Sequence, residues 1–167
     1  MSKSQLSTRL GRIEDLAGMK WGWEENSFTQ EKFTEGIKKG EQEFWVAETD
    51  NKVVGELHIL WNSEDPEEAN GMDRAYLCAF RTHKDFQSNG IGKLLMSTVL
   101  DRIISRGFKE VTICVEKEAD ELKTMYKNWG FNTFVKIKDV DIHNFNLDGS
   151  LKKFATSGEL YLNNLNK

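Results

Sequence analysis

The chain has 167 residues, of which 38% are hydrophobic and 30% charged, and its formal net charge is −4. That length suits a single domain, and ten Phe, five Trp and three Tyr are more large apolar side chains than a disordered chain carries. The mild acid excess and the lack of an apolar run of about 18 residues argue against a nucleic-acid partner and against a membrane protein.

The first part of the chain, up to residue 42, predicts helices. Apolar side chains follow helical spacing from Ile13 to Trp21, and a second helix is expected to begin at Thr29, a residue type favoured at helix N-caps. Gly40 should end this second helix, because glycine readily takes the left-handed conformation that follows a helix C-terminus.

Two strands and a loop follow. Residues 43–48 and 53–61 have the composition of strands and flank the pair Asp50–Asn51, a pattern typical of a β-hairpin. Residues 62–73 contain five acidic side chains, one proline and no basic side chain, which predicts a loop. Two interpretations of its charge remain open: a solvated surface, or a negative rim that steers a cationic ligand.

The remaining elements alternate between strands and helices. We expect strands at 76–82, 111–115, 131–140 and 153–165, and helices at 91–106 and 119–129. The order predicts a mixed α/β arrangement in one domain, with a right-handed strand–helix–strand unit in its middle.

The most informative segment is Gln87–Lys93, which follows a strand and opens the helix at 91–106. At a helix N-terminus the first backbone N–H groups have no partner within the helix. Gly90 and Gly92 lack the side chains that would hold a phosphate away from those groups. The segment therefore fits a pyrophosphate, and a tight turn that only permits close helix packing is the alternative.

Two motifs carry a resemblance to a known family. Residues 87–92 match the Q/R-x-x-G-x-G/A signature of the GNAT N-acetyltransferase superfamily, and residues 125–131 resemble its recurrent helix ending L-Y-x-x-x-G-F. The resemblance implies a single α/β (α+β) domain over residues 1–167, with a mixed, splayed β-sheet flanked by helices. Its implied parts are N-terminal helices at 1–42, a cofactor-binding core at about 43–140 and C-terminal strands at about 131–165.

The resemblance also implies a site for acetyl-CoA. Contacts to the pantetheine and thioester are expected from Phe80, Arg81 and Thr82, and contacts to the pyrophosphate from Gln87, Ser88, Asn89, Gly90, Ile91, Gly92 and Lys93. Tyr126 would be the general acid that gives a proton to the leaving thiolate. The alternative for Tyr126 is an aromatic side chain that only packs in the core.

The base that takes the proton from the acceptor amine is less evident. Many relatives carry an acidic residue on the strand before the signature, but residues 74–82 contain none. Glu56 on the preceding strand is the candidate base, and Asp73, His58 or a chain of water molecules are alternatives.

The leading hypothesis is an acetyl-CoA-dependent N-acetyltransferase that acetylates a primary amine of a small molecule or peptide by direct attack in a ternary complex. A catalytically silent acyl-CoA-binding module, acting as a sensor or partner subunit, is the alternative, and the family resemblance allows a homodimer. Cys78 and Cys114 each lie in an apolar run, so we interpret them as reduced thiols of a cytoplasmic protein, and their spacing indicates no metal site.

Overall fold

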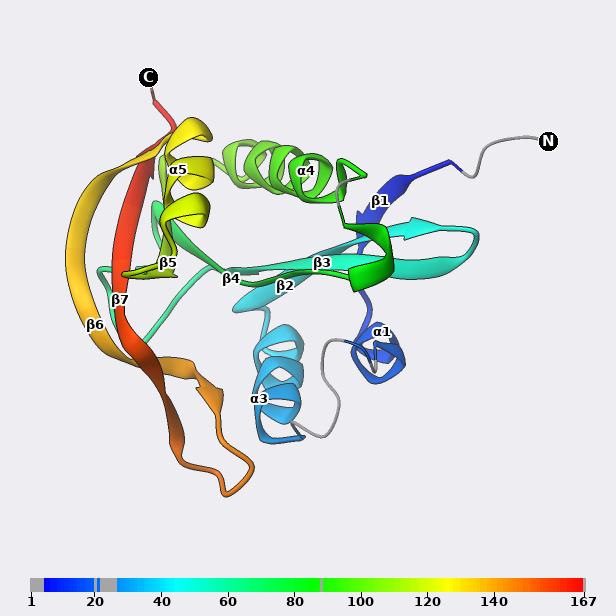
Figure 1. Ribbon diagram of the computed structural model, residues 1–167, viewed down its shortest axis with the longest axis horizontal. Coiled ribbons are helices and arrows are strands. Elements are labelled where there is room, and N and C mark those ends of the chain that lie inside the picture. Colours follow the sequence, from blue (N-terminus) through cyan, green and yellow to red (C-terminus); the bar gives the residue numbers. More distant parts are fainter. Residues whose placement is uncertain (1–4, 20, 22–26, 88, 167) are drawn as a thin grey trace.

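The computed structural model describes residues 5–19, 21, 27–87 and 89–166. Within this part of the chain, seven strands form one sheet in the order β1-β2-β3-β4-β5-β7-β6 (Figure 1). Neighbouring strands run antiparallel except β4 and β5, which are parallel. The strands are β1 (Ser7–Leu10), β2 (Gln42–Thr49), β3 (Lys52–Leu60), β4 (Arg74–Thr82), β5 (Glu110–Glu116), β6 (Phe131–Phe145) and β7 (Leu151–Asn164).

Helices cover both faces of the sheet. Helices α4 (Ile91–Ser105) and α5 (Asp120–Asn128) lie on one face, and α1 (Ile13–Gly18) and α3 (Ser27–Lys38) lie on the other (Figure 1). A short 3-10 helix, η1 (Lys84–Phe86), follows β4. Among the helices of the described residues, none combines the length and the apolar composition needed to cross a membrane.

An apolar core fills each side of the sheet. The larger core, which includes Leu57 and Leu95, lies on the side of α4 and α5, and the smaller one, which includes Phe33, lies on the side of α1 and α3. Side chains of a strand alternate between faces, so Leu57 of β3 points to α4, whereas Glu56 and His58 point to α3. This alternation determines the face on which each functional side chain lies.

Strands β4 and β5 separate part-way along their length (Figure 1). Their last paired residues are Leu77 and Ile113, although β4 continues to Thr82 and β5 to Glu116. Strand β4 also has a bulge here, with a left-handed backbone at Ala79 (φ 50°). The gap that opens after Leu77 is called the β4–β5 split below.

The predicted fold class is confirmed, because one mixed sheet is flanked by helices in a single domain. The predicted hairpin is also confirmed. Its two turn residues, Asp50 (φ 51°) and Asn51 (φ 63°), have the left-handed conformation that a tight two-residue turn requires. Gly40, with φ 74°, follows the end of α3 as predicted.

Two details of the predicted N-terminal part are wrong. Residues Ser7–Leu10, in the segment predicted to be helical, form β1, because they pair with residues 45–48 of β2. Thr29 is not an N-cap, since α3 begins two residues earlier. Its hydroxyl instead donates a hydrogen bond to Asn144 Oδ1 (2.9 Å), and so ties α3 to β6.

The last two strands are longer than predicted. Strand β6 extends to Phe145 and β7 begins at Leu151, so the pair forms a long hairpin whose tip lies beyond the rest of the sheet (Figure 1). Strand β6 lies at the edge of the sheet and pairs with β7 alone among the described strands.

Candidate active site

The N-terminus of α4 has the geometry of an anion site. Gly90 is the N-cap residue, with φ 79°, and no side chain of the described residues caps the helix. The Leu94 N–H donates to the Gly90 carbonyl (3.0 Å), so the N–H groups of residues 91–93 have no acceptor within the helix. The first turn carries no acidic side chain, and the partial positive charge of the helix dipole is therefore left uncompensated.

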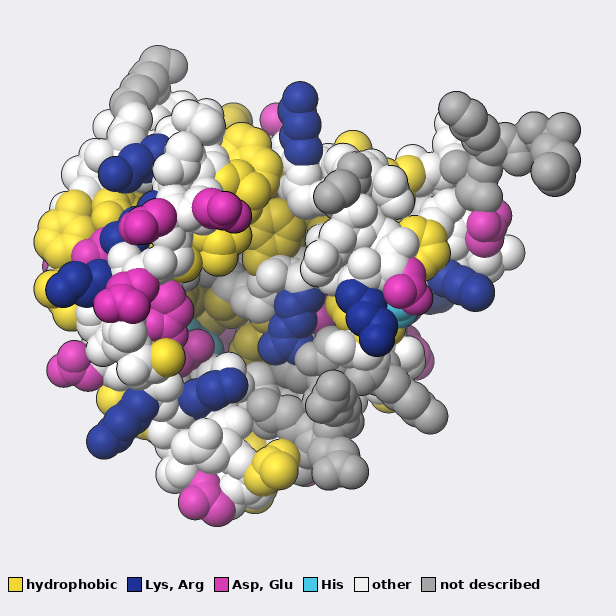
Figure 2. All heavy atoms as spheres, in the orientation of Figure 1, with side chains coloured by type: hydrophobic (Ala, Val, Ile, Leu, Met, Phe, Trp, Pro, Cys, Tyr) yellow, Lys and Arg dark blue, Asp and Glu magenta, His cyan; other side chains and the backbone are white. Residues whose placement is uncertain are grey.

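A cavity of about 430 Å³, called the α4–α5 cavity, lies beside this N-terminus. In the view of Figure 2, hydrophobic side chains gather in the hollow between α5 and α4. The cavity is lined by Phe80, Thr82, Gln87, Gly90, Ile91, Gly92, Lys93, Leu122, Met125, Tyr126 and Trp129. A mostly apolar wall with a few polar groups at one end is typical of a small-molecule site.

Most of the predicted cofactor residues come together in this cavity. Arg81 and Asn89 are not among its lining residues. Arg81 is the cross-strand partner of Glu56, and its charge acts on buried groups on the α3 side of the sheet. Asn89 is exposed in the loop before α4, and Ser88 lies outside the described residues.

Tyr126 of α5 lies in the wall of the α4–α5 cavity. Its ring packs against Trp129 and Phe131, with ring centroids 6.0 and 6.1 Å away. Burial raises its pKa to about 12, because the phenolate is poorly solvated there. The hydroxyl is therefore protonated at neutral pH and can act as a hydrogen-bond or proton donor.

Glu56, the predicted base candidate, is fully buried on the opposite face of the sheet. The Gln42 amide lies 3.0 Å from His58 Nδ1, and His58 Nε2 lies 2.6 Å from Glu56 Oε1. The amide donates to Nδ1, so Nε2 carries the proton and donates to the carboxylate. His58 stacks on Phe44 and packs against the tilted ring of Phe33, and its burial lowers its pKa.

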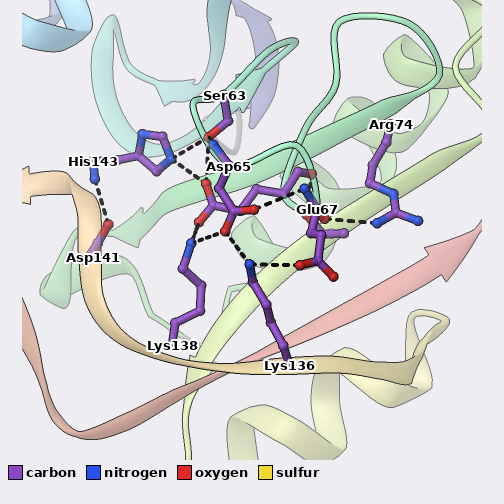
Figure 3. A network of polar contacts seen from close by, with 10 residues as sticks. Ser63, Asp65, Glu67, Arg74, Lys136, Lys138, Asp141 and His143 are labelled. Carbon is purple, nitrogen blue, oxygen red and sulfur yellow. Dashed lines mark hydrogen bonds and ion pairs between the residues drawn. The ribbon is translucent and has the colours of Figure 1, made fainter.

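The acidic loop at 62–73 is bound to β6 (Figure 3). Asp65 forms ion pairs of 2.8 Å with Lys136 and with Lys138. Burial alone would raise the pKa of Asp65, but hydrogen bonds from the two lysines outweigh it and hold the pKa at about 2. Glu67 binds Lys136 at 3.1 Å. Asp65 and Glu67 are thus held in ion pairs with β6, and they do not form a free negative rim, which was one of the two interpretations of this loop.

Glu68 is buried at the inner end of this loop. It accepts hydrogen bonds from Lys138, from Ser63 Oγ (2.8 Å) and from His143 Nε2 (2.7 Å). Burial would raise its pKa, but His143 and Lys138 lower it below the usual range. Its backbone carbonyl accepts a hydrogen bond from Thr112 Oγ1 of β5 (2.7 Å), which fixes the loop to the sheet.

The family model for the acetyltransferase (GNAT) family matches residues 10–131 of this chain. The chain belongs to the GNAT acetyltransferase family. The matched range includes the whole α4–α5 cavity, from Phe80 to Trp129.

One curated relative is the "Probable N-acetyltransferase camello" of Xenopus laevis, 34% identical over 88 residues. The match covers 53% of this chain and 37% of the relative, so the chain matches little more than a third of that protein's length.

Two solved structures have the same fold. The ribosomal-protein-S18-alanine N-acetyltransferase from Escherichia coli has a TM-score of 0.70 and 14% identity, covering 98% of this chain and 96% of its own. A GNAT family acetyltransferase from Elizabethkingia anophelis with acetyl-CoA bound has a TM-score of 0.63 and 16% identity, covering 98% and 100%.

Several residues of this candidate site are not indicated by the sequence patterns. Leu122, Met125 and Trp129 line the cavity but are not among the expected contacts, although their helical spacing with Tyr126 is a signal for a shared face. Glu68 and His143 were not connected either. Their hydrogen bond joins residues 75 positions apart, and no local pattern indicates such a contact.

Proposed function

We propose that this protein is an acetyl-CoA-dependent N-acetyltransferase that transfers the acetyl group to a primary amine by direct attack in a ternary complex. The observation that carries the proposal is the α4–α5 cavity, which brings the open N-terminus of α4 and Tyr126 together beside β4. Family membership and the bound acetyl-CoA of the Elizabethkingia anophelis structure support it.

The residues present fit the cofactor in size and chemistry. A Cβ added at Gly90 would meet no atom of the described residues within 4 Å, so a phosphate can approach the backbone at this point. The N–H groups of residues 91–93 and the exposed Lys93 supply donors and charge for a diphosphate. Phe80, Met125 and Trp129 supply apolar surface for a pantetheine chain.

The β4–β5 split suits a thioester. Beyond Leu77, the edge of β4 that faced β5 has no strand partner in the described structure, so backbone N–H groups on that edge can bind the pantetheine and the thioester carbonyl. Tyr126 would donate a proton to the sulfur as the carbon–sulfur bond breaks. No covalent enzyme intermediate is required.

The test combines binding with turnover. Thermal unfolding is followed with and without acetyl-CoA, and release of free thiol is measured with a panel of primary amines that includes small molecules and peptides. We expect stabilisation by acetyl-CoA and thiol release with at least one amine. Stabilisation without thiol release would favour the silent acyl-CoA-binding module, and the absence of both would overturn the proposal.

Location and assembly are further parts of the proposal. The two cysteines, Cys78 and Cys114, are free thiols in strands, which supports a reducing, cytoplasmic location. The protein can also form a homodimer, as the family resemblance allows. Cell fractionation tests the location, and size-exclusion chromatography with light scattering tests the homodimer.

A further inference from the structure

A second cavity, of about 500 Å³, lies on the face of the sheet opposite α4 and α5. We call it the α3–β6 cavity, because Phe33 of α3 and His143 of β6 line it, together with Ser63 and Glu64 from the acidic loop. Its volume is in the range of small-molecule sites. A ligand in this cavity can therefore reach His143 from the face of the sheet opposite the α4–α5 cavity.

His143 has the hydrogen bonds of an oriented base. Its Nε2 lies 2.7 Å from Glu68 Oε1, and a carboxylate can only accept, so Nε2 carries the proton. Within the described part of the chain, Nδ1 has no hydrogen-bond partner. The Nδ1 lone pair is thus available to a group in the cavity, and the side chain is 15% exposed.

The pair is fixed next to the β4–β5 split. The His143 ring centroid lies 5.3 Å from that of Tyr76, which directly precedes Leu77, the last residue of β4 paired with β5. Glu68 is held to β5 through Thr112, the cross-strand partner of Tyr76. Both strands that border the split therefore position the pair.

We propose that His143 is the general base of the acetyl transfer and that Glu68 is its positioning residue, an inference that rests on the proposed function. His143 Nδ1 takes one proton from the acceptor ammonium and later releases it to solvent. The neutral nitrogen forms the bond to the acetyl carbon while the carbon–sulfur bond breaks. The second proton lost by the nitrogen replaces the one that Tyr126 gives to the sulfur, so the products are the acetylamide, free thiol and one proton.

Access distinguishes His143 from Glu56. Glu56 is fully buried, its Oε1 is bound to His58, and it lines none of the described cavities, whereas His143 borders a cavity large enough for a ligand. Charged and titratable groups face His143 and its cavity from every element packed against it. They are Glu68 and Glu64 of the loop, Tyr76 of β4, Lys138 and Asp141 of β6, Lys32 and Glu35 of α3, and Lys39 and Glu41 between α3 and β2.

The test replaces His143 by Gln, with His83→Gln as the matched control on the loop after β4. An alkylamine with a pKa near 10.4 is almost wholly protonated at pH 7, so His143→Gln should lower kcat by about 10²- to 10³-fold there. The deficit should shrink as the pH approaches 10, because free amine then needs no base. His83→Gln should match the wild type at each pH, and acetyl-CoA should stabilise all three proteins equally.

A second variant separates chemistry from folding. His143→Ala leaves space beside Glu68, and added imidazole should restore part of the lost turnover. Wild-type turnover in His143→Gln, or a deficit of the same size at every pH without imidazole rescue, would overturn the assignment of His143 as the base. Neither result would affect the proposed function. A wild-type protein that releases no thiol with any amine would instead overturn the proposed function, and this inference with it.

Discussion

Tyr126 is a buried phenol, and its surroundings determine how it can act. Burial raises its pKa to about 12, which makes it a weaker acid than free tyrosine. A thiolate that forms in the same cavity is also poorly solvated, so the pKa of its conjugate acid rises above about 8.5. Both shifts have the same sign, and the phenol therefore keeps part of its ability to protonate the sulfur.

Replacing Tyr126 by Phe tests this role. We expect kcat to fall by about 10- to 10³-fold, because the proton donor is lost, while stabilisation by acetyl-CoA persists, because the ring still packs against Trp129 and Phe131. Thiol release and thermal unfolding measure the two effects. The matched control is Tyr161→Phe, whose hydroxyl donates to Glu159 (2.8 Å) outside the cavity. Equal turnover in both variants would remove Tyr126 from the mechanism.

Two histidine–carboxylate pairs lie on the α3 side of the sheet, and they differ in access. The ring of His58 is enclosed by Phe33 and Phe44, and Gln42 occupies its second nitrogen. His143 has its second nitrogen open to a cavity. The His58–Glu56 pair is thus a packed part of the core, whereas the His143–Glu68 pair is accessible to a ligand.

At the scale of elements, the two ends of α4 offer a matched comparison. Gly90 and Gly107 both have positive φ (79° and 86°), and in the part of the chain that the structure describes, a Cβ added at either would meet no atom within 4 Å. Replacement by Val should therefore destabilise the fold similarly, by about 1–3 kcal/mol, as measured by urea unfolding. Only Gly90→Val should abolish stabilisation by acetyl-CoA, because its side chain blocks the open helix N-terminus.

The response of the two glycine variants to acetyl-CoA can contradict this prediction. If acetyl-CoA stabilises Gly90→Val as much as Gly107→Val, the N-terminus of α4 does not bind the cofactor. A loss of stabilisation in both variants would mean that backbone strain anywhere in α4 disturbs the site, and that the position of Gly90 has no special role.

Elements with a local signal could be predicted from the sequence. Asp50–Asn51 marks a turn, Gly40 a helix end, and residues 87–92 a strand-to-helix connection, because each depends on the conformation of a few adjacent residues. Strand β1 could not, because its four residues become a strand only by pairing with β2, far along the chain. The length of β6 likewise depends on its pairing with β7.

The same distinction applies to the site. Its cofactor side is built from adjacent residues of one connection and one helix, so motifs could indicate Gly90, Gly92 and Tyr126. Its opposite side is formed by the acidic loop at 62–73 and the edge strand β6, which are far apart in the sequence and share no motif. Glu68 and His143 therefore became recognisable only through their contact.

At the scale of the whole molecule, paired carboxylates make stability depend on pH. Hydrogen bonds from Arg9 lower the pKa of Asp15, and lysines hold that of Asp65 at about 2 despite its burial. A carboxyl whose pKa is lower in the folded state adds stability above its unfolded pKa, near 3.8, and loses it as the pH falls. Asp141 acts in the opposite direction, because burial raises its pKa.

The net expectation is a loss of stability between about pH 4 and pH 2. Urea unfolding of the wild type and of Asp65→Asn at pH 6, 4, 3 and 2 measures it. The wild type should be the more stable protein at pH 6, and the difference should shrink towards pH 2, where Asp65 becomes protonated. A difference that stays constant over this range would show that the ion pairs of Asp65 do not titrate as described.

The position of β6 has a consequence for solubility. An outer strand of 15 residues with exposed Phe134 and Ile137 could template the addition of strands from other molecules, as in fibrils. Its register against β7 shifts at four places, and ion pairs of Lys136 with Asp65 and Glu67 hold the acidic loop against it. A foreign strand could follow so irregular an edge for only a few residues, which protects the protein from aggregation there.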